Sequence, residues 1–233
     1  MSMKKSVSKI FLTLFAVTFV LAFSSCKKDE TNPGSGSGGD APFVPEAVDL
    51  GLSVCWASCN LGATTPEAYG DYYAWAEIVP NKARFSWSSY RWKGETEDTY
   101  RKYIGGKKRY LDATDDAATV SLKGSWRIPT QAEIEELFSD PDIDMKWIAE
   151  KKCMKFTSTK VGYEGNFIFL PAAGARMNAT DQGEGTNGYF WSSELKSDLM
   201  TVVSAMFNDG SVSIDENDLP FFGYSIRAVC SKE

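Results

Sequence analysis

The sequence of 233 residues contains no histidine. This absence excludes Ser-His-Asp and Cys-His nucleophile pairs and the usual zinc sites, although chemistry by carboxylates alone remains possible. No pair of carboxylates can be placed on a common cleft from the sequence, so glycoside hydrolysis has no support. We therefore expect a protein that is not an enzyme, with no catalytic residues, no metal and no cofactor.

Basic residues are scarce relative to acidic ones. The chain has 25 Lys and Arg against 31 Asp and Glu, a net charge of −6. Residues 1–25 contain three lysines and no acidic residue, so a chain that begins at residue 26 keeps 22 basic residues and carries a net charge of −9. This balance argues against nucleic acid as a partner.

The N-terminus has the pattern of an export signal. Three lysines precede an apolar run over residues 10–23, which is too short to cross a bilayer comfortably. Small residues then lead to Cys26, and the whole resembles a bacterial lipoprotein signal, with cleavage before Cys26 and lipid on its thiol. Several acyl chains, at about 0.8 kcal/mol per buried CH₂, anchor a protein firmly. We expect a signal peptide over residues 1–25 and membrane contact only through lipid at Cys26.

The residues after Cys26 suggest where the protein is displayed. Residues 27–30, Lys-Lys-Asp-Glu, resemble the export signal of surface-displayed lipoproteins in one group of Gram-negative bacteria. Residues 31–40 are rich in Gly and Ser, a composition typical of flexible tethers. We expect a tether over residues 26–44, one folded domain over 45–233, and a location on the outer face of the outer membrane.

Four cysteines remain after lipidation, namely Cys55, Cys59, Cys153 and Cys230. An even number in an oxidising compartment suggests disulfides, and four cysteines allow three pairings. If the chain around Cys55 is extended, Cys55 and Cys59 lie about 13 Å apart, too far to bridge each other. The expected bonds are either Cys59–Cys230 with Cys55–Cys153, or Cys55–Cys230 with Cys59–Cys153. Buried thiols are the alternative.

The clearest local signal is a helix start at Thr130. Thr130 can cap the helix, and Glu133, three residues on, can complete a capping box. Ile134, Leu137 and Phe138 then share one apolar face. The helix should end at Asp140, because the residue before a proline avoids helical geometry.

Short strands are predicted throughout the rest of the domain. Alternating or β-rich patterns and turn residues indicate strands over residues 48–57, 155–158, 166–170, 188–193, 201–207, 211–214 and 223–230, the fifth and sixth joined by an Asn-Asp-Gly turn. Asp residues at 112, 115 and 116 should open a second, short helix. Many short strands with two helices indicate an α+β fold.

Two stretches of the sequence have side chains suited to binding a ligand or a metal ion. Trp87, Tyr90 and Trp92 stand among polar residues and can either stack on a ligand or cover a satellite core. The acids near Asp112 can in principle hold Ca²⁺, but the run lacks the glycine and distal glutamate of a recognised calcium loop. We therefore expect no metal there, and take the three aromatic residues as the candidate ligand-binding residues.

Five ordered motifs support a resemblance to a known family. They are Ser53-Val-Cys-Trp-Ala-Ser-Cys-Asn-Leu-Gly-Ala63, Gly124-Ser-Trp-Arg-Ile-Pro-Thr130, Ile168-Phe-Leu-Pro-Ala-Ala-Gly174, Gly188-Tyr-Phe-Trp-Ser-Ser193 and Tyr224-Ser-Ile-Arg-Ala-Val-Cys230. Together they resemble the Fibrobacter succinogenes major paralogous domain, from about residue 45 to the end.

This resemblance implies a C-type lectin-like domain in which both termini meet on one sheet. It also implies a Cys59–Cys230 disulfide, which would leave Cys55 and Cys153 as natural partners. Members of the family are mostly surface or secreted proteins, sometimes attached to adhesins or pilus components, and their molecular activity is largely unassigned.

The sequence and the resemblance together predict a lipid-anchored cell-surface recognition module that binds a glycan or a surface protein. One alternative is a structural or accessory component of a pilus or surface complex. Another is an enzyme similar to formylglycine-generating enzymes, which share a distant variant of this fold and hold copper through a cysteine pair near the C-terminus. Only Cys230 lies in that region.

Overall fold

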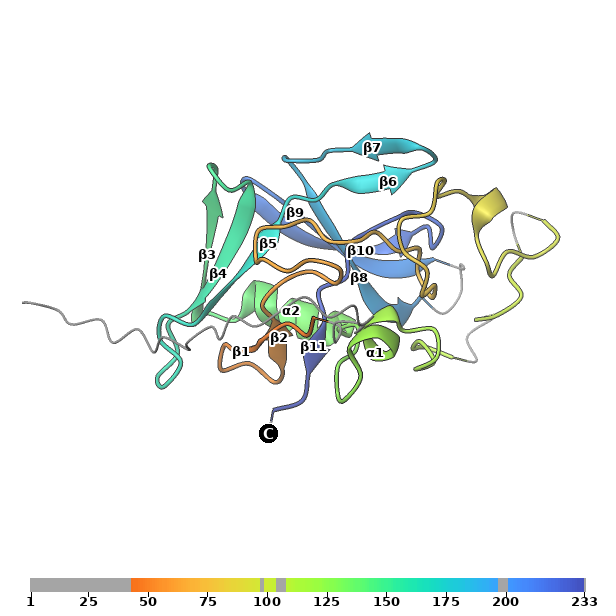
Figure 1. The fold of residues 1–233 in the computed structure, drawn as a ribbon. Coiled ribbons are helices and arrows are strands. Elements are labelled where there is room, and N and C mark those ends of the chain that lie inside the picture. Colours follow the sequence, from red (N-terminus) through yellow and green to blue (C-terminus); the bar gives the residue numbers. More distant parts are fainter. Residues whose placement is uncertain (1–42, 97–98, 104–107, 197–200, 233) are drawn as a thin grey trace, which may run out of the picture. The chain divides into compact units, whose positions relative to one another are not determined.

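The computed structural model describes residues 43–96, 99–103, 108–196 and 201–232 (Figure 1). The predicted signal peptide over residues 1–25, the lipidation site Cys26 and the tether up to residue 42 lie outside the described residues. The described residues cluster as one unit, and all elements below belong to it.

Helix α2 (Gln131–Ser139) begins and ends where the sequence predicts. Thr130 accepts a hydrogen bond from the Glu133 amide, and the Glu133 carboxylate accepts one from the Thr130 amide at 2.8 Å, so both halves of the capping box are formed. The helix stops at its C-cap, Asp140. Its apolar face packs against β8, β9 and β10 and against β3.

Glu133 also binds Arg127, which makes the cap of α2 sensitive to pH. Arg127 donates from both Nη atoms to the two carboxylate oxygens. Burial acts to raise the pKa of Glu133, but the hydrogen bonds from Arg127 and Thr130 outweigh it and hold the pKa below its ordinary value of 4.5. A carboxyl whose pKa is lower in the folded state stabilises the fold above its unfolded pKa, and this stabilisation is lost as pH falls through the folded pKa.

We therefore expect Glu133→Gln to lower the free energy of unfolding by about 1.5 kcal/mol at pH 7, because the charge-assisted bonds are lost. The deficit should shrink as pH falls below 4.5, where the wild-type carboxylate becomes protonated. Urea unfolding between pH 7 and pH 3.5 measures both values. Glu135→Gln, at an exposed position of the same helix, is the control and should have little effect. A deficit for Glu133→Gln that does not change with pH would contradict the ion-pair argument.

The strands form small antiparallel sheets rather than one large sheet. Over the described residues, three sheets of three strands and one of two strands are present, with two α-helices and one 3₁₀ helix, η1 (Trp87–Ser89). The α+β class predicted from the sequence is confirmed in this general form.

The first predicted strand is in fact a hairpin. Residues 48–57 were expected to form one strand, but β1 (Ala47–Asp49) and β2 (Cys55–Ala57) pair with each other in antiparallel register. The chain turns at Gly51, whose φ of +78° favours glycine, and the Gly51 amide donates to Asp49 Oδ1 at 2.8 Å. Leu50 and Leu52 are buried in the turn region, so their alternation reflects core contacts and not one extended strand.

The chain ends on the same sheet, where β11 (Val229–Cys230) pairs with the other edge of β2. Figure 1 shows β1, β2 and β11 together beside the C-terminus. The predicted strand over residues 223–230 is thus mostly not a strand. Gly223, Tyr224 and Ser225 instead form isolated bridges to three different segments.

The remaining strands follow α2. β3 (Ile143–Ile148), β4 (Cys153–Ser158) and β5 (Phe167–Pro171) form one meander, and β8 (Gly188–Leu195), β9 (Val202–Asn208) and β10 (Ser211–Asp218) form another. The hairpin predicted around the Asn-Asp-Gly turn is confirmed, since Ser211 pairs with Asn208. The sequence missed β3 and the short hairpin of β6 (Ala175–Met177) and β7 (Thr180–Gln182).

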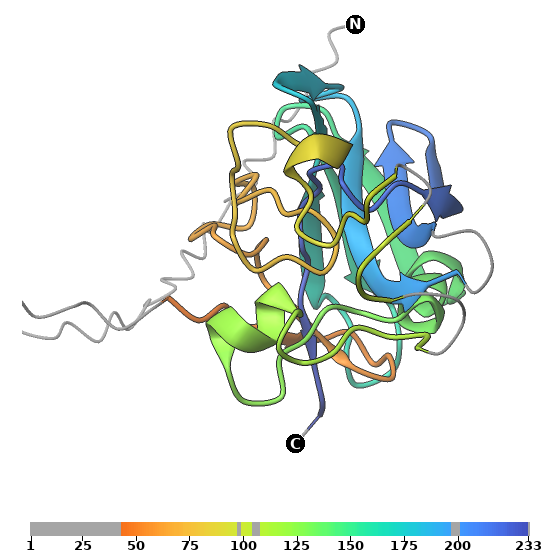
Figure 2. The ribbon, with the colours of Figure 1, turned by 90° about the vertical axis from the view of Figure 1, so that its right-hand side faces the viewer.

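Between β2 and α2 the chain makes a long excursion with little regular structure. Figure 2, which looks onto this stretch, shows loops with η1 and the short helix α1 (Ala117–Leu122). Asp116 caps α1 by accepting from the Thr119 amide at 2.9 Å, as expected. Tyr73 and Trp75 of the excursion pack in one core cluster with Trp191 of β8. The excursion therefore belongs to the core.

Candidate functional site

The aromatic residues proposed as ligand contacts are used inside the protein. Tyr90 is buried, its hydroxyl donates to the Trp75 carbonyl at 3.1 Å, and burial raises its pKa well above the ordinary value. Trp92 is half-buried and donates from Nε1 to the Ala76 carbonyl at 2.8 Å. Trp87 packs edge-to-face on Tyr100 and Phe221, with ring centroids 5.2 Å and 6.2 Å apart. Of the two alternatives, the structure favours the satellite core.

The acidic residues near α1 also have internal partners. Lys102 binds both Asp112 and Asp115, and Asp116 accepts from the Thr119 and Ile128 amides at 2.9 Å each. Within the described ranges, no group of three or more Cys, Asp or Glu side chains is arranged to hold a metal ion. Ion pairing and helix capping therefore account for these carboxylates.

The four cysteines of the domain are all buried. Cys59 and Cys153 are thiols that donate to the Ala63 and Lys151 carbonyls, so the Cys59–Cys230 and Cys55–Cys153 bonds implied by the resemblance are not formed in the structure. Burial raises the pKa of Cys153 to about 11. Cys230 lies directly opposite Cys55, on the neighbouring strand.

Arg227 is a buried cation that connects three parts of the core. It donates to Asn60 Oδ1 at 3.0 Å, to the Ala57 carbonyl at 2.8 Å and to the Phe169 carbonyl at 2.6 Å. These acceptors are all neutral, and burial lowers the pKa of the guanidinium to about 10. The residue joins β2, the loop after it and β5, so its role is structural.

A polar groove lies where the N-terminal end of α2 meets β8 and β10. It encloses about 360 Å³ and is lined by Lys108, Arg109, Gln131, Glu194, Leu195, Lys196, Val203 and Glu216. The segment before α1 lies along this groove because it pairs with the end of β8. Tyr110 forms an isolated β-bridge with Glu194, and the Leu195 amide donates to the Arg109 carbonyl at 2.8 Å. We name it the Glu194 groove.

Glu194 organises the groove from a buried position. One carboxylate oxygen accepts from Arg109 Nε at 2.9 Å, and the other accepts from the Gln131 amide, the first of α2, at 3.0 Å. A carboxylate at this end of a helix is favoured by the helix dipole. The Arg109 side chain is 69% exposed, so it is held through Nε while the rest of the guanidinium faces outward.

The opposite wall carries a second carboxylate. Glu216 accepts from Gln131 Nε2 at 2.8 Å and pairs with Lys196. The hydrogen bond from Lys196, followed by that from Gln131, lowers the pKa of Glu216. The groove thus presents a guanidinium, an amide, an ammonium and two carboxyl groups, and each is held by its neighbours.

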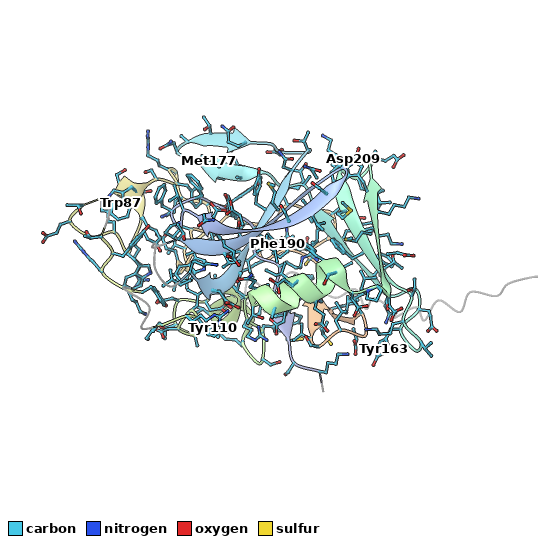
Figure 3. The ribbon with its side chains drawn as sticks, turned by 180° about the vertical axis from the view of Figure 1, so that it is seen from behind. Trp87, Tyr110, Tyr163, Met177, Phe190 and Asp209 are labelled. Carbon is cyan, nitrogen blue, oxygen red and sulfur yellow. The ribbon has the colours of Figure 1, made fainter. Side chains whose placement is uncertain are left out.

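An exposed aromatic ring stands beside the groove. Tyr110 is 47% exposed, and the Arg109 guanidinium lies 5.7 Å from its ring centroid. Figure 3 shows Tyr110 next to one end of α2, well separated from Trp87. The groove could not be predicted from the sequence because its residues come from five separate segments. The signal in the sequence was charge immediately after the predicted strand over residues 188–193.

A second groove, of about 430 Å³, lies along β1 and β5. Both strands are end strands of their sheets over the described residues. Phe167, 43% exposed, lies on its β5 side. Asn166 Nδ2 donates to the Asp49 carbonyl at 2.8 Å and connects the two walls.

Comparison of the chain with protein-family models, with curated proteins and with solved structures found no match. Within the part of the chain that the structure describes, no helix has the length and apolar character needed to span a membrane.

Proposed function

We propose that this protein is a lipid-anchored recognition module on the bacterial outer surface, and that it binds a glycan in the Glu194 groove. Arg109, Gln131, Lys196, Glu216 and the rim residue Tyr110 take the role first given to Trp87, Tyr90 and Trp92.

The arrangement of the chain supports a C-type lectin-like domain similar to the Fibrobacter succinogenes major paralogous domain. The first hairpin and the last strand share one sheet, as that resemblance implies. Trp56, Trp126 and Trp191, from three of the five motifs, are buried in the core. The motifs are therefore in positions where they can maintain such a fold.

The observation that carries the glycan proposal is the set of fixed polar groups in the Glu194 groove. Sugar hydroxyls both donate and accept hydrogen bonds, so they suit a wall that alternates carboxylate, amide and guanidinium groups. A volume of about 360 Å³ lies within the usual range for small-ligand sites, roughly 300–1,000 Å³. An exposed tyrosine ring at the rim can stack on the apolar face of a sugar.

The same groups argue for binding without hydrolysis. A glycosidase needs one carboxylic acid with a raised pKa that can protonate the leaving group. Glu194 is tied to Arg109 and to the start of α2, and the pKa of Glu216 is lowered by Lys196 and Gln131. For a formylglycine-generating-like enzyme, Cys230 would have to react from a buried position opposite Cys55.

The test is binding of the full chain to a glycan array, followed by titration of the best glycan. We expect Arg109→Ala to weaken that binding at least tenfold, because the exposed guanidinium supplies the outward-facing donors of the groove. Urea unfolding of the same variant separates loss of binding from loss of the ion pair, because Arg109 is exposed but its partner Glu194 is buried.

Trp87→Ala is the matched control, and it should leave glycan affinity unchanged because Trp87 is remote from the groove (Figure 3). Loss of glycan affinity in Trp87→Ala but not in Arg109→Ala would show that the glycan binds near Trp87 and not in the Glu194 groove. An array without any binding would refute the glycan proposal.

Assembly into a pilus or surface complex is the second candidate, favoured by the β1–β5 groove. End strands can pair with an added strand from another protein. The short lengths of β1 and β5 and Pro171 at the end of β5 limit such pairing. Co-purification with pilus subunits together with an empty glycan array would favour assembly.

A further inference from the structure

The register of the terminal sheet places two cysteines face to face. In the antiparallel pair of β2 and β11, Val229 is opposite Trp56 and Cys230 is opposite Cys55. The adjoining hydrogen bond, from the Ala57 amide to the Ala228 carbonyl at 2.9 Å, continues the same register. Residues directly opposite each other in antiparallel strands have Cα atoms about 4.5–5.5 Å apart. That separation lies within the range that a disulfide spans, about 4.4–6.8 Å.

We propose that Cys55 and Cys230 form an intramolecular disulfide that joins the first hairpin to the last strand. The pairing differs from the one implied by the family resemblance, which joins Cys59 to Cys230. Cys59 lies on the loop after β2 and donates to the Ala63 carbonyl at 3.2 Å, and Cys153 donates to the Lys151 carbonyl at 3.0 Å. The strand register places Cys230 directly opposite Cys55.

The bond forms by thiol–disulfide exchange with an external disulfide, either a protein disulfide of the cell envelope or oxidised glutathione. A thiolate from one of the two cysteines attacks a sulfur of the oxidant, forms a mixed disulfide and releases one thiolate. The second cysteine loses its proton and attacks the protein sulfur of the mixed disulfide, which releases the second thiolate. The oxidant gains the two electrons that the two cysteines lose.

The cross-link would close a loop of about 175 residues, nearly the whole domain. In the chain-entropy model, a bond that closes a loop this long is among the most stabilising. It would also hold β11, a strand of only two residues, against β2.

Mass spectrometry can read the pairing directly. The full chain, purified from the envelope of expressing bacteria, is alkylated without reduction and digested with trypsin and chymotrypsin. Cleavage after Trp56 separates Cys55 from Cys59, and trypsin places Cys153 and Cys230 on the short peptides 153–155 and 228–232. We expect peptide 228–232 linked to the peptide that contains Cys55, with Cys59 and Cys153 alkylated.

A second measurement uses reduced protein oxidised with glutathione, which makes the result independent of cellular location. Cys55→Ser, Cys230→Ser and the double variant should each lower the melting temperature of the oxidised protein by about 10–20 °C, without additivity. Reduced wild-type protein should melt at nearly the temperature of these variants. Cys59→Ser should keep the difference in melting temperature between the oxidised and the reduced protein. A Cys59–Cys230 or Cys55–Cys153 link, or four alkylated thiols after both treatments, would overturn the proposal.

Discussion

Replacing Arg227 by methionine should lower the free energy of unfolding by about 4 kcal/mol. Three buried oxygens would lose their hydrogen-bond donors, at a cost of roughly 1–3 kcal/mol each. Removal of a buried charge would offset part of this loss. The oxygens belong to Asn60, Ala57 and Phe169, which are all buried, as is Arg227 itself. Methionine keeps the length of the side chain, so the loss reports the hydrogen bonds more than the volume. Urea unfolding at pH 7 measures it.

Arg127→Met is the matched control. Arg127 is partly exposed, and its main partner is a single carboxylate, that of Glu133. We expect a loss of about 1 kcal/mol, in the range of partly exposed ion pairs. Equal losses for the two arginine variants would show that Arg227 does not connect the core in the way its contacts indicate.

Replacing Trp191 by alanine should lower the free energy of unfolding by about 4 kcal/mol. Deleting a fully buried tryptophan side chain usually costs roughly 3–5 kcal/mol. Trp191 is completely buried, its ring stacks on Tyr224 with centroids 4.2 Å apart, and its Nε1 donates to the Tyr73 carbonyl at 2.7 Å. The substitution would leave a cavity between β8, the excursion and the C-terminal segment. Thermal and urea unfolding should both detect it.

Trp87→Ala provides the comparison for Trp191 as well as for the glycan site. Trp87 is half-buried, and its ring contacts with Tyr100 and Phe221 are edge-to-face, so we expect a loss of about 1 kcal/mol. If Trp87→Ala destabilised the protein as much as Trp191→Ala does, the excursion would be a larger part of the core than its contacts suggest.

Elements specified by neighbouring residues were predicted well from the sequence. Helix α2 follows from Thr130, Glu133 and the proline after Asp140, which act within a few residues of each other. The hairpin of β9 and β10 follows from its turn in the same way. The first hairpin was misread because burial of Leu50 and Leu52 depends on residues far along the chain, and alternation in the sequence does not distinguish a strand from a buried turn.

The candidate site could not be predicted for a related reason. Arg109, Gln131, Glu194 and Glu216 are separated by up to 107 residues and meet only because β8 pairs with the segment at Tyr110 and lies beside α2. Trp87, Tyr90 and Trp92 drew attention because they are close in sequence and aromatic. Their partners Trp75, Ala76 and Phe221, which bury Tyr90 and partly cover Trp87 and Trp92, are set by the tertiary fold.

The terminal sheet also determines how this domain can be joined to other chains. β1 and β11 flank β2 and run parallel to each other. The chain enters the sheet at Ala47 and leaves it at Cys230, and these residues are separated by two strand spacings across the sheet and two residues along it. The two ends of the sheet segment therefore lie about 12 Å apart. A linker of a few residues can bridge that distance. The domain is therefore suited to circular permutation, and it can be inserted whole into a surface loop of a host protein without separating the ends of that loop.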